Sequence, residues 1–520
     1  MYILKLHRLL RLSLLACVIA LLPRAVHADP VLRLTDARSE YPLGQYIGVL
    51  EDASGKLNID DITGAKYRGQ YRTFNEDAPR LGLSRSVFWV RLHLRNDSSQ
   101  NDWMLVQRFA DTHYLDLYVP GENGKSYAVT RSGNLRPFAS RDIPHRRIIF
   151  SLSLDAGQER TVYLRYQSQT DINLNISLWT IPAFVEVDWV DSFWMGMFYG
   201  LLGLILITSL LWYLFLRKTS YLYLFAYIAS TTAAYAFYDG YAQMYFSADR
   251  AESSLYFMPM LLSISMLALL GFGRVILSTP MLGKYTQYIY HALAIAWLCV
   301  FFITPFIDYI TTIMALIPLL LVTPGFLLVV GVISWKWQKS PGRFLVFGLF
   351  SICLVFLGFL LAQFGYLDKQ FFVETGPRIG VIAMVVFLSM SLVGHVQWLQ
   401  QLRRQRSKAL TISEKKFQAI FDQTFQMIVI LSPAGIVLDG NKTALDYVKS
   451  SAADAFGKYI WEKPWWRQDP EQREKLSHYV KQVAAGELVS FEMASTGPDG
   501  EQRWIDFSLK PYKEESGQSG

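Results

Sequence analysis

Cysteine is scarce in this sequence of 520 residues. The three cysteines are Cys17, Cys299 and Cys353, and the last two lie inside long apolar runs. The polar segments therefore have no cysteine with which to build a disulfide framework or a cysteine-ligated zinc site. Each polar segment must instead fold around a hydrophobic core of its own.

Charged residues are also few, at 18% of the chain, against about 25% in a typical soluble domain. Hydrophobic residues make up 52% and aromatic residues 15%, which excludes a largely disordered protein. The net charge of +7 would suggest a nucleic-acid partner if it came from a polar segment. However, residues 29–191 contain 19 Lys and Arg against 21 Asp and Glu, and residues 412–520 contain 13 against 16. The positive charge belongs to an N-terminal leader and an apolar middle segment, so we expect no nucleic-acid binding.

Residues 1–28 are typical of a secretory signal peptide. Basic residues precede an apolar run at Leu12–Leu22, and Val26-His27-Ala28 supplies small residues for cleavage. As a helix this run would span about 16 Å, which is too short to cross a bilayer. The alternatives are an uncleaved anchor and a lipoprotein attached through Cys17.

Apolar stretches long enough to cross a bilayer recur between residues 192 and 399, and they predict a seven-helix transmembrane domain. They are Phe193–Leu216, Tyr221–Tyr241, Leu255–Leu277, Tyr288–Thr304, Ile310–Trp335, Phe344–Phe364 and Ile379–Trp398. Six or eight helices are the alternatives, because Pro305 and Asp308 leave a very short hairpin after the fourth stretch. No Asp, Glu, Lys or Arg lies near the middle of a stretch, which argues against a proton pump or an ion-coupled transporter.

Charge placement orients the predicted helices. A cleaved signal peptide puts the first polar segment outside, so loops after odd-numbered helices face the cytoplasm. Those loops and the exit from the seventh helix carry Arg217, Lys218, Arg274, Lys284, Lys336, Lys339, Arg343, Arg403, Arg404, Arg406 and Lys408. The outward ends carry Arg250, Lys369 and Arg378, together with all the acidic residues of this region. The distribution follows the positive-inside rule and predicts an exported N-terminal segment and a cytoplasmic C-terminus.

Residues 29–187 switch to the period-two alternation that is typical of β-strands. We predict strands at Val87–Arg95, Trp103–Phe109, Tyr114–Val119, Tyr127–Thr130, Arg147–Leu154, Thr161–Tyr166 and Asn173–Trp179. Short strands at this spacing, separated by turn signals, predict an all-β sandwich of the jelly-roll kind.

The alternation also assigns a face to each side chain. In the first predicted strand Phe88, Val90, Leu92 and Leu94 share one face, which we expect to be the core. The opposite face presents rings, arginine and carboxylate, which suit a sugar or another small polar ligand. The candidate ligand-binding residues on this face are Trp89, Arg91, His93, Tyr114, Asp116 and Tyr118. The alternatives are that loops cover these residues or that they form a solvated face.

A basic cluster follows at Arg141, His145, Arg146 and Arg147. It suits an anionic ligand, so Arg141, His145 and Arg146 are further candidate binding residues. If acidic residues of the same segment pair with the cluster, its role is structural. The histidines of this segment lack the spacing of metal ligands, so we predict no metal site and no catalytic residues.

The order of these parts resembles a known family of bacterial receptors. The sequences Phe88-Trp89-Val90-Arg91-Leu92, Leu115-Asp116-Leu117-Tyr118 and Pro144-His145-Arg146-Arg147, followed by seven helices, are similar to those of 7TMR-DISM proteins. The name stands for seven-transmembrane receptors with diverse intracellular signalling modules. The resemblance covers roughly residues 30–400. It implies a periplasmic jelly roll similar to carbohydrate-binding modules, placed to sense an extracellular ligand.

A helical linker is predicted at residues 400–416. Apolar residues approximate a heptad seam at Leu399, Leu402, Leu410, Phe417 and Ile420, although Arg403 and Arg406 occupy seam positions. We expect this helix to dimerise, and a single solvated linker is the alternative.

Residues 417–520 resemble a PAS domain, which has an α+β fold. The resemblance consists of the entry segment Phe417–Asp422, Asn441 at the start of a helix, and a turn at Gly457. The chain stops before the last strand of such domains, so we expect an incomplete PAS domain and an effector domain beyond it. The domain has no cysteine for a flavin photoadduct, and His478 stands alone on a charged helix, so no cofactor is predicted.

Together these parts predict a multidomain receptor of the bacterial inner membrane with a periplasmic sensor. We expect the sensor to bind a small ligand such as a carbohydrate, and a homodimer formed through the linker and the PAS domain to relay the signal. The resemblance implies an effector such as a diguanylate cyclase, with or without a phosphodiesterase, or a histidine kinase. No catalytic motif of these enzymes occurs in the sequence. The alternatives are a transporter or channel with an exported binding domain and a carbohydrate-binding membrane anchor.

Overall fold

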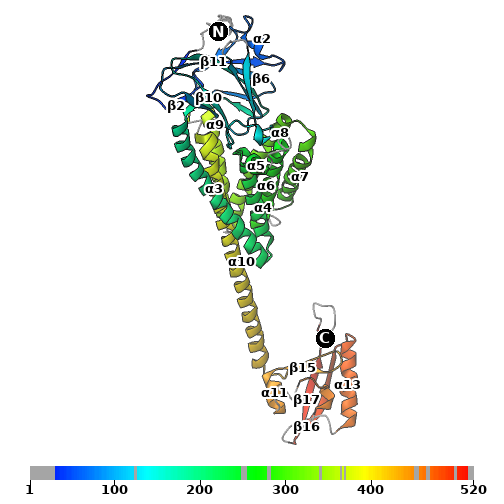
Figure 1. The fold of residues 1–520 in the computed structure, drawn as a ribbon. Coiled ribbons are helices and arrows are strands. Elements are labelled where there is room, and N and C mark those ends of the chain that lie inside the picture. The colour runs from blue at the N-terminus through cyan, green and yellow to red at the C-terminus, as the bar shows by residue number, and fades with distance from the viewer. Residues whose placement is uncertain are drawn as a thin grey trace, which may run out of the picture. The chain divides into compact units, whose positions relative to one another are not determined.

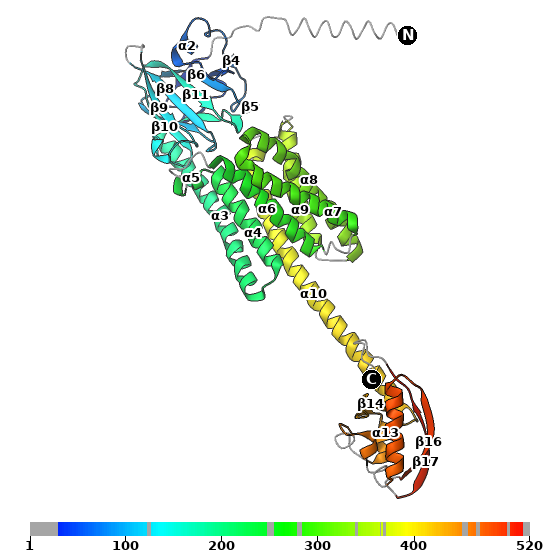
Figure 2. The ribbon, with the colours of Figure 1, turned by 90° about the vertical axis from the view of Figure 1, so that its right-hand side faces the viewer.

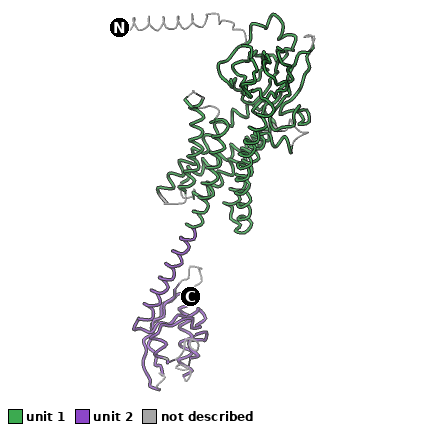
Figure 3. The backbone as a smooth tube through the Cα atoms, turned by 60° about the vertical axis from the view of Figure 1, so that its left-hand side comes forward, with its two compact units in different colours: residues 1–398 green, residues 399–520 purple. Residues whose placement is uncertain are grey.

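The fold is taken from a computed structural model. The described residues are 30–121, 126–246, 254–277, 283–338, 342–363, 366–367, 371–449, 456–463, 469–496 and 500–512. The chain divides into two compact units, residues 1–398 and residues 399–520 (Figure 3). The predicted signal peptide lies outside the described residues.

Two β-sheets form the N-terminal part of the first unit (Figure 1). The larger sheet has the strand order β4 (Arg72–Thr73), β3 (Ile47–Asp52), β6 (Val87–Asn96), β11 (Glu159–Gln167), β8 (Tyr114–Pro120) and β9 (Tyr127–Ser132), and β1 (Leu32–Leu34) also pairs with β6. The smaller sheet has the order β10 (Ile148–Ser153), β7 (Asp102–Gln107), β13 (Ile176–Thr180) and β2 (Glu40–Pro42). A separate pair consists of β5 (Arg80–Leu83) and β12 (Asp171–Asn173).

The two sheets enclose one hydrophobic core. On β6, Phe88, Val90, Leu92 and Leu94 are all buried in this core, as the alternation predicts. Val90 lies opposite Leu164 of β11, so the apolar face continues from strand to strand. The structure therefore confirms an all-β sandwich, and the jelly-roll assignment stays a prediction.

The observed strands differ from the predicted ones at several positions. Asn173–Trp179, predicted as one strand, is divided between β12, which pairs with β5, and β13, which joins the smaller sheet. The sequence analysis did not predict β3, which has six residues and is buried along most of its length. It also did not predict β1, β2, β4 and β5, which have only two to four residues each. Alternation over so few residues cannot be distinguished from irregular chain.

In the part of the chain that the structure describes, seven long helices follow the sandwich, and the last of them continues into the second unit (Figure 2). They are α3 (Ile181–Leu216), α4 (Thr219–Tyr238), α6 (Ser254–Ile276), α7 (Lys284–Ile303), α8 (Tyr309–Gln338), α9 (Gly342–Gln363) and α10 (Gly376–Gln423). Among the described residues, six of these helices are long and apolar enough to cross a membrane. The exception is α4, which is rich in Tyr, Ser and Thr and packs against α3 and α6. The structure thus confirms a multi-pass helical domain at the predicted positions.

The first and last of these helices are longer than the predicted spans. α3 begins at Ile181, well before the predicted start at Phe193, and it follows β13 directly. α10 continues through the predicted linker as a single helix to Gln423. Two short elements accompany them: α5 (Tyr241–Tyr245) follows α4, and one π-helical turn at Phe371–Thr375 precedes α10.

After the end of α10, the described residues of the second unit form two hairpins and two helices. They are β14 (Val429–Leu431), β15 (Val437–Gly440), α11 (Lys442–Val448), α13 (Pro470–Ala484), β16 (Val489–Thr496) and β17 (Gln502–Leu509). Asn441 caps α11, because its Oδ1 accepts from the Ala444 backbone N–H at 3.0 Å. Its Nδ2 donates to the carbonyl oxygens of Phe421 and Gln426, which ties the end of α10 to this module. The helix start predicted at Asn441 is therefore confirmed.

Candidate functional site

The outer face of the larger sheet, which the sequence marks as the candidate ligand site, is largely covered. Trp89 is only 1% exposed and belongs to a second apolar cluster with Ile62, Tyr71 and Tyr163. Ile62 lies on the short helix α2 (Ile59–Thr63). The Tyr118 ring packs on Trp89 with 5.3 Å between ring centroids. The stretch around α2 thus covers this face, which was one of the alternatives that the sequence left open.

Polar residues of the same face make contacts with neighbouring parts of the sandwich. The Arg91 guanidinium lies 3.9 Å from the Tyr71 ring centroid. His93 Nδ1 is 2.7 Å from Thr161 Oγ1. These contacts hold neighbouring parts of the sandwich together, and a ligand-binding role for Arg91 and His93 stays a prediction.

Asp116 and Tyr114 are linked through one arginine. The two terminal nitrogens of the Arg136 guanidinium, Nη1 and Nη2, donate to the Asp116 carboxylate, and the Nη2 bond to Oδ2 is 3.1 Å long. The same guanidinium lies 5.3 Å from the centroid of the Tyr114 ring. Asp116 is 4% exposed, and the half-buried guanidinium of Arg136 neutralises its charge. Sequence alternation placed Asp116 and Tyr114 on this face but could not show that Arg136 pairs with them.

The basic cluster lies at the other end of the sandwich, against the start of α3. His145 Nε2 is 3.1 Å from Asp188 Oδ2, and Arg146 Nη2 is 3.6 Å from Asp188 Oδ1. Arg147 donates to the Asp191 carboxylate. The two acids lie on α3, the first membrane helix, rather than on a strand of the sandwich. The cluster therefore joins the sandwich to a helix that enters the transmembrane domain.

Arg141 and the turn at Gly240 fix a second helix to the same place. Arg141 donates to the carbonyl oxygen of Arg146 at 2.9 Å and also to the side chain of Gln243 on α5. Burial lowers the pKa of Arg141 to about 10, so it remains charged at neutral pH. Gly240 has φ of +84°, and a Cβ there would lie 2.5 Å from the Arg146 carbonyl oxygen. Only glycine permits this close approach.

The last membrane helix is joined to the sandwich as well. Arg108, just after β7, is 2.9 Å from Glu374 in the π-helical turn before α10. Arg378, in the first turn of α10, is 2.7 Å from Asp239 at the end of α4 and donates to the Glu374 carbonyl oxygen at 2.8 Å. These side chains therefore connect the sandwich with the end of α4 and the start of α10.

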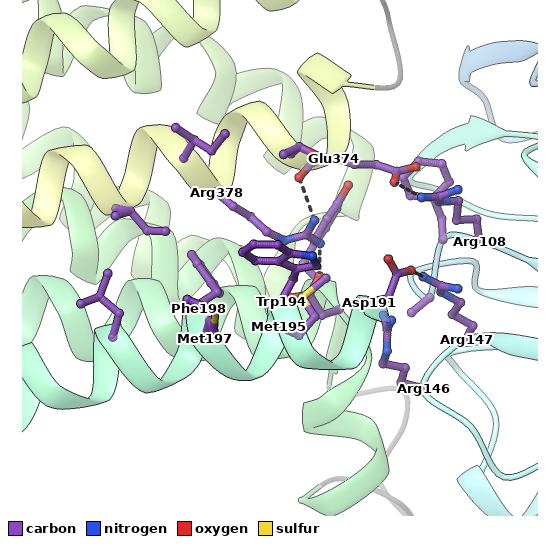
Figure 4. Close-up of a pocket in the computed structure, with 18 residues that line it drawn as sticks. Arg108, Arg146, Arg147, Asp191, Trp194, Met195, Met197, Phe198, Glu374 and Arg378 are labelled. Carbon is purple, nitrogen blue, oxygen red and sulfur yellow. Dashed lines mark hydrogen bonds and ion pairs between the residues drawn. The ribbon is translucent and has the colours of Figure 1, made fainter. Parts of the chain in front are cut away.

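A cavity of about 700 Å³ lies where these elements meet. Figure 4 shows Arg108, Arg146 and Arg147 reaching it from the sandwich, and Arg378 reaching it from α10. Its remaining wall is apolar and comes from α3 and α10, with residues such as Trp194, Met197, Phe198, Leu201, Ile379 and Ile382. Burial and the nearby charge of Arg146 lower the pKa of Arg147, while Asp191 opposes this shift. We take this junction as the candidate functional site.

A second contact between the sandwich and the helices lies at Asp111 and His113. The His113 ring packs edge-on against Tyr309 of α8, with 5.8 Å between centroids. Burial raises the pKa of Asp111 to about 7 and lowers the pKa of His113 to about 4. Both groups are therefore largely uncharged in mildly acidic solution. Within the described ranges, no three His, Cys, Asp or Glu side chains gather as a metal site.

Sequence reasoning found the basic cluster but did not identify Asp188 and Asp191 as the acids that pair with it. It also did not identify the two acids that pair with Arg108 and Arg378 nearby. Asp239 and Glu374 were noted only as acidic residues at the outward ends of helices. The sequence did contain one indication of these pairs. The predicted topology places both acids and the arginines near Arg146 on the same, outward side of the membrane. Which acid meets which arginine depends on helix packing, which the sequence pattern does not specify.

The chain was compared with known proteins. Residues 44–180 match the family described as 7TMR-DISM extracellular 2, and residues 191–394 match the family described as 7TM diverse intracellular signalling. Residues 421–520 match the PAS fold. These matches cover most of both compact units.

Individual relatives match over a small part of their length. The sensor histidine kinase TmoS of Ectopseudomonas mendocina is 27% identical over 114 residues, which are 22% of this chain and 12% of the relative. The hybrid signal transduction histidine kinase D of Dictyostelium discoideum is 26% identical over 113 residues, 21% of this chain and 7% of the relative. The crystal structure of the PAS domain of an HTR-like protein from Haloarcula marismortui is 20% identical. The match covers 22% of this chain and 93% of that chain, with a TM-score of 0.20.

Proposed function

The chain belongs to the 7TMR-DISM receptors and carries a C-terminal PAS domain, and from this premise we propose that it relays a periplasmic signal to a cytoplasmic effector. The membrane it occupies in this proposal is the bacterial inner membrane. The ligand is a small molecule such as a carbohydrate, recognised by the sandwich.

One observation carries the proposal: the sandwich is ion-paired to the start of the helix that continues into the PAS module. Arg108 holds Glu374, and α10 begins two residues later and runs unbroken to Gln423. A helix without a break transmits a shift or rotation of its first turn along its length. Ligand binding drives such a shift only if the two states of the receptor bind the ligand with different affinity.

The effector in this proposal is a histidine kinase or a diguanylate cyclase, with or without a phosphodiesterase. The family resemblance supports both kinds of effector. Two relatives are named as histidine kinases, and this favours the first.

We also propose that the receptor acts as a homodimer through α10 and the PAS module. Leu410, Phe417 and Ile420 are 63%, 59% and 71% exposed within the second unit. Their spacing of seven and three residues is that of a heptad seam, so a second copy of α10 would bury all three. Chemical crosslinking of a cysteine at position 410 tests this, and absence of a crosslinked dimer would contradict it.

Amide hydrogen exchange on the full chain in lipid nanodiscs tests the relay. Glu374→Gln removes the charge that pairs with Arg108, and we expect exchange to change in the α10 segment 399–423 as well as near residue 374. Asp308→Asn is the matched control, because it breaks a 2.7 Å pair between Arg85 and the start of α8, a helix that does not continue into the PAS module. A Glu374→Gln effect confined to the neighbourhood of residue 374 would refute the relay.

A further inference from the structure

The junction cavity has a charged end and an apolar wall. The apolar wall is formed by α3 and α10, and several of its side chains are exposed. Trp194, Met197 and Ile379 are 61%, 53% and 52% exposed. Because both helices are membrane spans, these side chains lie where acyl chains of lipid would contact them. The cavity is thus open to an amphiphile from the membrane.

The charged end has more hydrogen-bond donors than acceptors. Four arginines and three carboxylates line the cavity. Among the described residues, no hydrogen bond is made by Arg108 Nε, Arg146 Nε and Nη2, Arg147 Nε and Arg378 Nε. The free acceptors at this place are Glu374 Oε1 in the lining and Asp188 Oδ1, which lies 3.6 Å from Arg146 Nη2. Arg146 and Arg147 are 6% and 7% exposed, so their unsatisfied N–H groups are deeply buried. Buried donors without acceptors are unfavourable, and a ligand with several anionic oxygens would satisfy them.

We propose that this cavity binds an anionic amphiphile of the membrane, with a phosphate or carboxylate head at the arginines and an acyl chain along Trp194 and Phe198. The guanidinium groups match the oxygens of such a head, and the apolar wall matches the chain. A free sugar or inorganic anion would leave that wall without a partner. The site touches the sandwich, α3 and α10 together, so its occupancy would set how firmly the sandwich is joined to both helices. The inference does not depend on the proposed relay.

Tryptophan quenching by brominated lipids tests the proposal on the wild-type chain. Full-length protein is placed in phosphatidylcholine nanodiscs that contain a varied fraction of brominated phosphatidylglycerol or brominated phosphatidylcholine. The difference between wild type and Trp194→Phe isolates the signal of Trp194. We expect brominated phosphatidylglycerol to reach half-maximal quenching of Trp194 at an about tenfold lower lipid fraction than brominated phosphatidylcholine, since one charge-assisted hydrogen bond gives roughly that preference. Equal fractions for the two lipids would overturn the proposal.

Variants and a competing anion make the test more specific. Arg146→Gln should remove most of the preference for the anionic lipid, while Arg85→Gln, which also alters a sandwich-to-helix ion pair but lies outside the cavity, should retain it. Inorganic phosphate should not displace the anionic lipid, and displacement would show a site for a free anion instead. Because the lipid comparison uses the wild-type chain, the proposal can fail even if Arg146→Gln does not fold.

Discussion

The sandwich presents two polar surfaces that look alike in sequence but differ in structure. On the outer face of the larger sheet, Arg91 and Asp116 are matched by Tyr71 and Arg136, all within the sandwich. At the junction, the partners of the basic cluster come from α3 and α5, and the neighbouring Arg108 pairs with Glu374 in the turn before α10. The polar residues of the first surface thus find their partners within the sandwich, whereas those of the second find them on the membrane helices.

This difference separates a structural surface from a coupling surface. Contacts within one domain stabilise that domain and carry no information to another one. Contacts between domains make the position of each depend on the other, and buried groups left unsatisfied mark a place where a ligand can change that position. Substitutions on the two surfaces should therefore have different consequences, and so should a change of pH that titrates Asp111.

Trp89→Ala should strongly destabilise the sandwich, because Trp89 is buried beneath α2. Loss of a buried tryptophan typically costs about 3–5 kcal/mol. The measurement is amide exchange of β6 and β11 in the full chain, where protection should fall. Trp189→Ala, at a residue of α3 that is 73% exposed, is the control and should leave β6 unchanged. Loss of sugar binding by Trp89→Ala with full protection of β6 would instead make the outer face a ligand site.

Gly240→Ala should loosen the junction without damaging the sandwich core. The added Cβ would lie 2.5 Å from the Arg146 carbonyl oxygen at a φ of +84°, and the combined clash and backbone strain should cost about 2 kcal/mol. Exchange should rise in α5 and around Arg141. Gly283→Ala has a φ of +100° but open space around its Cβ, so it isolates the backbone contribution. Equal effects of the two variants would show that the close approach is unimportant.

Raising the pH from 6 to 8 should weaken the contact at Asp111. The pKa of Asp111 is about 7 in the folded chain, against an ordinary value of 3.8, so stability from its protonated form is lost as the pH rises through 7. The loss is about 1 kcal/mol over this interval. His113, whose pKa falls from 6.5 to about 4, acts in the opposite direction and offsets part of this loss, so the comparison with Asp111→Asn is what isolates the Asp111 contribution. Thermal unfolding of Asp111→Asn should lack the loss between pH 6 and 8, and an unchanged profile would contradict the assignment.

The architecture could be predicted from the sequence because the periodicity of apolar residues distinguishes strands from helices, and the length of the apolar runs identifies the membrane helices. The core face of β6 and the cap at Asn441 could be predicted from local patterns alone. The burial of Trp89 could not be predicted, because a segment far from it in sequence supplies the cover. The pairing of Arg108 with Glu374 joins residues far apart in the chain, and only the packed helices bring them together.

Arg85→Gln should have the smallest effect, although it also breaks an ion pair between the sandwich and a helix. The Arg85 side chain is 70% exposed, and Asp308 keeps its hydrogen bonds to Thr311 after the change. Exposed pairs contribute little because water and salt screen them. The melting temperature and the exchange of α8 should therefore stay within experimental error. A clear loss of stability would mean that exposed ion pairs also couple the sandwich to the helices. The buried arginines of the junction would then not be what distinguishes the two surfaces.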